Sequence, residues 1–171
     1  MTNLENPKIK LNAARYFYKG ISSLYKPGSE TVVIPNKLYY ICDALIWELY
    51  AAFDLILQDI NKELGMGINE KEVKWNNSYK TKLKDLNDNL FLILSSQINQ
   101  QWFKHLKEAR NYISHHGQIF IAMEYDGPRI KVASLGVRTL LSGDGSIDLL
   151  DQTQRWIDSM SDLVERVGRS L

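Results

Sequence analysis

The spacing of apolar residues predicts a chain that is mostly helical. Apolar positions recur at three- and four-residue steps, which is the period of one face of an α-helix. Asn99 is suited to the N-cap of one of these helices. The pattern predicts five helices, over residues 8–26, 36–64, 77–95, 99–116 and 147–168.

The third helix is predicted as one continuous segment. Its inward positions keep a helical spacing throughout, and Ser95 and Ser96 separate it from the next helix. These inward positions are Tyr79, Leu83, Leu86, Leu90 and Ile93.

The second helix, residues 36–64, is apolar around more than one face. Beside its main stripe it carries further aromatic residues, namely Tyr39, Tyr40, Trp47 and Tyr50. A helix that is apolar on most sides is buried on most sides. We therefore expect a central helix or one shared with a second subunit, and we predict a homodimer that buries part of 36–64 or of 99–116.

A β-hairpin is predicted within residues 118–134. Residues 119–125 alternate in the manner of a strand, Asp126-Gly127-Pro128 is a turn signal, and residues 129–134 form a plausible return strand. Residues 31–34 have an extended pattern, and 141–146 that of a loop. No repeat, low-complexity segment or linker interrupts the chain. We predict a single all-α domain over residues 1–171, with about five helices and this hairpin as an insertion.

The amino-acid composition excludes few classes of function, whereas the pattern of apolar residues predicts the fold class. With a net charge of +1 over 171 residues, any anion site must be a local patch. Cys42 lies in an apolar helical pattern and is expected to be a packed thiol. The N-terminus lacks the form of a signal peptide, and no apolar run is long enough to span a bilayer. We expect a cytoplasmic protein with no membrane partner.

The end of the helix over 99–116 gathers polar residues that can act on an anion. Gly117 can adopt the left-handed conformation that ends a helix. His115 and His116 then belong to the last turn, about one turn after Arg110. Asn111 and His115 are four residues apart and share a face. A forked cation, an amide and an imidazole can therefore converge at one helix end.

Positive charge surrounds this helix end in the sequence. Lys104, Lys107 and Arg110 outnumber Glu108, and the hairpin adds further cations. We expect the local field to favour an anion. The predicted RNA-binding residues are Lys104, Lys107, His116, Arg129 and Lys131.

One acid of the second helix is a candidate partner for Arg110. Glu48 borders the main apolar stripe of residues 36–64, so it is the best candidate for a partly buried carboxylate that could orient Arg110. The alternative is that Glu48 is an ordinary surface charge.

Several chemistries lack their motifs in this sequence. There is no glycine-rich phosphate loop, no Gly-x-Ser-x-Gly elbow and no His-Glu-x-x-His pattern. One cysteine and three histidines do not make a thiolate zinc site. We expect neither a metal nor a cofactor.

The segment from Arg110 to His115, Arg-Asn-Tyr-Ile-Ser-His, resembles the motif of the HEPN family (higher eukaryotes and prokaryotes nucleotide-binding domains). The resemblance implies an up-and-down helical bundle, with Arg110 and His115 as an active pair and Asn111 as the polar residue between them. Many members are dimeric, metal-independent endoribonucleases of toxin–antitoxin, defence or RNA-processing systems. An antitoxin-type protein partner is accordingly expected.

Two functions follow from this resemblance. In the first, an imidazole acts as base or acid and a guanidinium binds the phosphate, so RNA is cleaved to a 2′,3′-cyclic phosphate and a 5′-hydroxyl. One His115 supplies one proton-transfer group, and a two-fold dimer would supply a second. In the alternative, the chain is a non-catalytic HEPN-like module that binds a nucleotide, RNA or a protein partner. A third reading is a purely structural helical dimer.

Overall fold

Six α-helices and one β-hairpin form the part of the chain that the structure describes. The computed structural model describes residues 4–28, 36–119, 121–126, 129–135 and 148–171, and the side chains of these ranges outside 123–134. The all-α prediction is confirmed. In chain order the elements are α1 (Glu5–Leu24), α2 (Asn36–Glu63), a short 3₁₀ helix η1 (Glu70–Glu72), α3 (Asn77–Leu86), α4 (Asp88–Asn99), α5 (Gln101–His116), β1 (Ile121–Asp126), β2 (Arg129–Leu135) and α6 (Leu149–Ser170).

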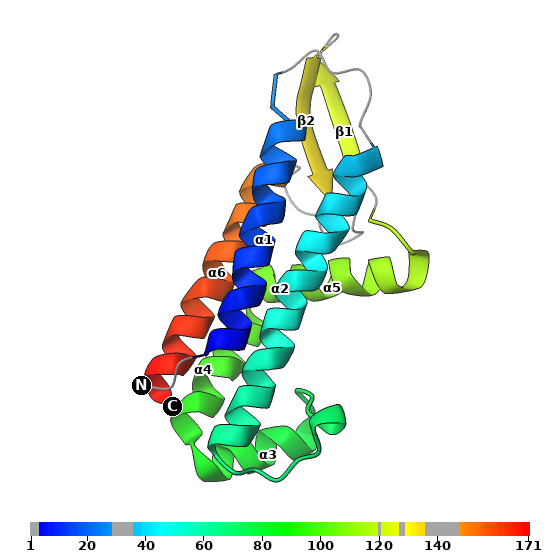
Figure 1. Cartoon of the computed structure of the whole chain (residues 1–171). Helices are drawn as coiled ribbons and strands as arrows, with labels where there is room; N and C mark the ends of the chain where they lie inside the picture. Colours follow the sequence, from blue (N-terminus) through cyan, green and yellow to red (C-terminus); the bar gives the residue numbers. More distant parts are fainter. Residues whose placement is uncertain (1–3, 29–35, 120, 127–128, 136–147) are drawn as a thin grey trace.

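Three long helices, α1, α2 and α6, run side by side as an up-and-down bundle, and α5 crosses α2 at a steep angle (Figure 1). Helix α2 packs against α1, α5 and α6. The residues of its main apolar stripe are buried, among them Leu38, Leu45, Leu49 and Ile60, whereas Tyr40 and Trp47 are exposed. The prediction of a helix buried on most sides is confirmed, and Cys42 is a buried free thiol within it.

The helix predicted over 77–95 is in fact two helices. Asn87 ends α3 and caps α4, because its Oδ1 accepts the N–H of Leu90 at 3.0 Å. The prediction of a break at Ser95 and Ser96 was wrong, since α4 continues to Asn99. Asn99 is therefore not an N-cap; Gln100 precedes α5 and makes no side-chain capping bond.

The predicted hairpin is confirmed. Strands β1 and β2 pair antiparallel, and an irregularity after Glu124 shifts the register so that Tyr125 lies opposite Ile130. Its base is tied to the bundle, because the N–H of Ile119 donates to Oδ1 of Asp43 on α2 at 2.9 Å. The predictions for residues 31–34 and 141–146, and the turn at 127–128, lie outside the described residues.

Candidate functional site

The C-terminal end of α5 has the predicted form. Gly117 adopts a left-handed conformation with φ of 81°, and its N–H donates to the carbonyl of Ile113 at 2.7 Å. His115 and His116 occupy the last turn. The apolar side of α5, with Phe103, Leu106, Ala109 and Ile113, is buried. The polar residues of this helix end are therefore fixed in space by a well-packed helix.

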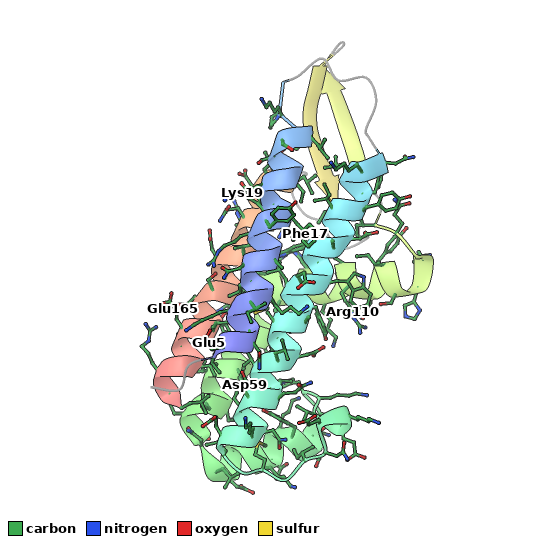
Figure 2. All side chains as sticks on the ribbon, in the orientation of Figure 1. Glu5, Phe17, Lys19, Asp59, Arg110 and Glu165 are labelled. Carbon is green, nitrogen blue, oxygen red and sulfur yellow. The ribbon has the colours of Figure 1, made fainter. Side chains whose placement is uncertain are left out.

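The side chain of Arg110 is held against α2 by two aromatic rings. Its guanidinium carbon lies 5.1 Å from the ring centre of Trp47 and 5.0 Å from that of Tyr50. Such cation–π contacts orient the guanidinium without neutralising its charge. Nη1 donates to Oδ1 of Asn111 at 3.2 Å, whereas the buried Nε–H has no acceptor among the described residues. Figure 2 shows Arg110 where α5 crosses α2.

The acid near Arg110 is Asp54, not Glu48. Glu48 forms an ion pair with Lys10 of α1 at 3.0 Å, so the prediction that it orients Arg110 was wrong. The reason is helical geometry: Glu48 is rotated roughly 100° from Trp47, while Asp54 is four residues after Tyr50 and shares its face. Burial raises the pKa of Asp54, and the charges of Arg110 and Lys74 partly offset this rise.

Arg110 and Asp54 open onto a pocket between α2, α5 and the segment around η1, with a volume of about 560 Å³; we call it the α2–α5 pocket. The buried rings of Phe53 and Phe103, 4.6 Å apart, belong to its wall. Its charged lining residues are mostly cationic: Lys71, Lys74, Lys107 and Arg110 against Asp54 and Glu70. Its remaining polar and aromatic lining includes Tyr50, Gln58 and Trp75.

His115 does not line this pocket. Its side chain is exposed at the end of α5, and within the described residues no hydrogen bond joins it to Asn111, whose Oδ1 accepts from Arg110 instead. His116 stacks on Tyr112 with ring centres 4.3 Å apart. One protomer therefore does not bring Arg110 and His115 into the same pocket.

The five predicted RNA-binding residues do not form one group. Lys107 lines the α2–α5 pocket. Lys104 borders a different hollow, next to His105, where burial lowers the pKa of the His105 imidazole. Arg129 and Lys131 belong to β2, and their side chains lie outside the described part of the structure.

Sequence reasoning missed most residues of the pocket, among them Asp54, Gln58, Lys71, Lys74 and Trp75. The spacing of Tyr50, Asp54 and Gln58 would have placed these three on one face. Lys71, Lys74 and Trp75 belong to a segment without helical periodicity, so no pattern linked them to α5. The tertiary structure brings these three residues to the pocket, because the segment around η1 packs beside α2.

The described residues hold neither a metal-binding cluster nor a membrane-spanning helix. Within the described ranges, no three His, Cys, Asp or Glu side chains lie close enough together to hold a metal ion. None of the described helices combines the length and the apolar character needed to cross a membrane.

Comparison with known families identifies the chain. The family model for Cthe2314-like HEPN matches residues 1–139, which include all helices from α1 to α5 and the whole of the Arg110–His115 segment. No curated protein and no solved structure matches the chain. The matched region extends over well more than half of the sequence and agrees with the helical bundle described above. The chain therefore belongs to the Cthe2314-like HEPN family.

Proposed function

We propose that this protein binds RNA at the α2–α5 pocket and cleaves it as a dimer, without a metal. The observation that carries the proposal is the state of Arg110. Its guanidinium is fixed over Trp47 and Tyr50, and its buried Nε–H finds no acceptor in the part of the chain that the structure describes. A guanidinium fork matches the oxygens of a phosphate, and an unsatisfied buried donor is costly until an acceptor arrives. Arg110 is thus prepared for a phosphate of the RNA backbone.

The electrostatics of the pocket support the same ligand. Four cationic residues and two acids line it, so its formal charge is +2. Clefts lined by an excess of one charge attract ligands of the opposite charge. Tyr50 and Trp75 add aromatic surface, and bases of single-stranded RNA stack on such rings.

The proposed reaction is the transfer of the phosphate from the 5′-oxygen to the 2′-oxygen. A base removes the proton of the 2′-hydroxyl, the 2′-oxygen forms a bond to phosphorus, and the bond to the 5′-oxygen breaks as an acid protonates it. The products are a 2′,3′-cyclic phosphate and a 5′-hydroxyl. Arg110 stabilises the charge on the phosphorane, and His115 transfers a proton.

A second protomer completes the site in this proposal. His115 is exposed and lies outside the pocket of its own protomer. A two-fold dimer can place His115 of one protomer beside Arg110 of the other, because such an interface repeats every contact twice. Tyr40 and Trp47 of α2 are exposed, and the Trp47 ring contacts the guanidinium of Arg110, which lines the pocket.

The test is RNA cleavage by the purified protein in EDTA, followed by identification of the product ends. The wild type is expected to give 2′,3′-cyclic phosphate and 5′-hydroxyl ends. Arg110→Ala and His115→Ala should each lower the rate by about 10²-fold or more. Cleavage that requires a divalent metal, or that survives both substitutions, contradicts the proposal.

Mixing the two variants tests whether the site is shared. A mixed dimer of Arg110→Ala and His115→Ala keeps one complete site if each site combines residues of both protomers. After subunit exchange, an equal mixture should regain about a quarter of the wild-type activity, since half of the dimers are mixed and each has one complete site of two. No recovery would show that the two residues act within one protomer or that all four are needed.

The second candidate is a non-catalytic module that binds RNA or a nucleotide. The separation of His115 from the α2–α5 pocket favours it. Under this reading the protein binds RNA and releases it uncut. Lys107→Ala and Arg110→Ala weaken that binding, whereas His115→Ala leaves it unchanged.

A further inference from the structure

We propose that the α2–α5 pocket selects a guanine base of the bound RNA, through hydrogen bonds from the edge of the base to Asp54 and Gln58. The inference rests on the proposed function, because RNA held by its phosphate at Arg110 brings a neighbouring base to this pocket. It assigns base specificity to two residues outside the Arg110–His115 segment.

Asp54 and Gln58 form a polar edge along one wall of the pocket. They are four residues apart on α2, so their side chains leave the same face of the helix, and both line the pocket. A carboxylate accepts hydrogen bonds at two oxygens, and a glutamine amide can donate from its nitrogen. The wall therefore offers two adjacent acceptors followed by a donor.

The Watson–Crick edge of guanine is complementary to this order. It has two neighbouring donors, N1–H and the amino group N2, followed by the acceptor O6. Asp54 accepts from both donors, and Gln58 donates to O6. RNA-binding proteins commonly recognise unstacked bases along this edge.

The other three bases present a different edge. Adenine and cytosine have one amino donor next to a ring nitrogen that only accepts, and uracil has one N–H between two carbonyl oxygens. A carboxylate at Asp54 would face a lone pair in each of these cases, and unlike guanine they could not satisfy both of its oxygens. A ligand that lacks the matching donors leaves an acceptor of the site unpaired, and this difference gives a hydrogen-bonding site its selectivity.

The rest of the pocket fits a single nucleotide. Its volume of about 560 Å³ lies in the usual range for small-ligand sites. The rings of Tyr50 and Trp75, both partly exposed, provide surface for stacking. Lys71, Lys74 and Lys107 line the same pocket as Arg110 and can hold the phosphate.

The experiment measures binding rather than cleavage. Wild-type protein in EDTA is titrated with GMP, AMP, CMP and UMP by calorimetry. GMP is expected to bind at least about fivefold more tightly than each of the others, the discrimination of one good bidentate contact. Asp54→Asn should abolish this preference, because the new amide puts a donor against a donor. Gln58→Glu should weaken GMP selectively, since a carboxylate repels O6.

Two control variants separate selectivity from general effects. Asp59→Asn makes the same chemical change five residues along α2, outside the pocket, and should keep the preference (Figure 2). Lys107→Ala should weaken all four nucleotides to a similar extent, because phosphate contacts carry no base information. Equal affinity for the four nucleotides, no binding of any of them, or an unchanged preference in Asp54→Asn overturns the inference.

A second arm distinguishes a nucleotide within RNA from a free nucleotide. A short single-stranded RNA with one guanosine among uridines should bind more tightly than GMP and than the all-uridine strand. If GMP binds and the RNA does not, the pocket is a site for a free nucleotide and the RNA subsite is refuted. A protein that prefers GMP and this RNA but cuts no RNA keeps the subsite, while the proposed cleavage fails.

Discussion

Arg110 shows how single residues prepare the candidate site. Two aromatic rings of α2 hold its guanidinium, and one carbonyl oxygen of Asn111 accepts from Nη1. This arrangement leaves most of its donors available, which an ion pair with a carboxylate would not. The pKa of the neighbouring acid, Asp54, is raised because desolvation in the pocket disfavours its charged form. Both features favour an incoming phosphate over an internal salt bridge.

At this scale we predict that His115, not His116, transfers the proton. His116 is stacked on Tyr112, whereas His115 is exposed. His115→Ala should lower RNA cleavage by about 10²-fold or more and leave folding nearly intact. His116→Ala should cost much less. Cleavage rates and melting temperatures of both variants check this. Equal loss of activity in the two variants, with unchanged melting temperatures, contradicts the assignment.

A second prediction concerns the pH dependence of protein stability that results from the raised pKa of Asp54. Because burial raises its pKa, the folded state holds the proton more tightly than the unfolded state does. Unfolding then releases a proton, so stability is lost as pH rises from the unfolded value of about 3.9 through the folded pKa. Asp54→Asn should melt higher than wild type at neutral pH, and the difference should fade toward acidic pH. Thermal unfolding across pH measures it.

The control for this prediction is Asp85→Asn, at an exposed carboxyl of α3. Its melting temperature relative to wild type should not change with pH in the same way. A lower melting temperature for Asp54→Asn at neutral pH would mean that the attraction to Arg110 and Lys74 outweighs the cost of burial.

At the scale of elements, the junction at Asn87 depends on one side chain. Its Oδ1 caps α4 by accepting from Leu90, and its Nδ2 donates to the carbonyl of Ser170 at 3.4 Å. Asn87→Ala should destabilise the protein by about 1 kcal/mol, the typical value of a helix N-cap. The melting temperature should fall by about 2–4 °C for a chain of this size. Asn89→Ala removes only a contact with Ser170 Oγ and should change it less.

The hairpin depends on a contact with α2. The carboxylate of Asp43 accepts the N–H of Ile119, just before β1 begins. Asp43→Ala leaves this N–H without its acceptor, a cost of about 1–3 kcal/mol. Asp43→Asn keeps an oxygen in place and should recover most of the stability. Hydrogen exchange at the Ile119 amide should accelerate in the alanine variant only. Similar exchange in both variants would show that the hairpin is held by other contacts.

For the whole molecule we predict a homodimer that uses the exposed face of α2. Tyr40 is 64% exposed and Trp47 is 40% exposed, and their spacing of seven residues puts them on one face. Sedimentation should show a dimer at micromolar concentration. Tyr40→Lys should weaken it, whereas Tyr16→Lys, at an exposed tyrosine of α1, should not. A wild-type monomer at that concentration contradicts the prediction.

The local pattern of the sequence was enough to determine most of the helices, the hairpin and the end of α5. Helical periodicity, strand alternation and the conformational freedom of Gly117 act over a few residues, so they can be recognised without the tertiary structure. The Arg110–His115 segment was recognised for the same reason. The junction at Asn87 was missed because Leu83 and Leu90 keep a helical spacing across it, while the capping bond depends on one side chain.

Only the tertiary structure decided which residues surround Arg110. Asp54, Lys71, Lys74 and Trp75 come from two segments distant from α5 in sequence, and they meet because α5 crosses α2 beside η1. Glu48 was preferred to Asp54 because its place beside the apolar stripe was visible in the sequence, whereas the rotation that turns it toward Lys10 of α1 was not. Such contacts depend on how helices pack. The periodicity of apolar residues predicts which face of a helix is buried, but it does not predict which element packs against that face.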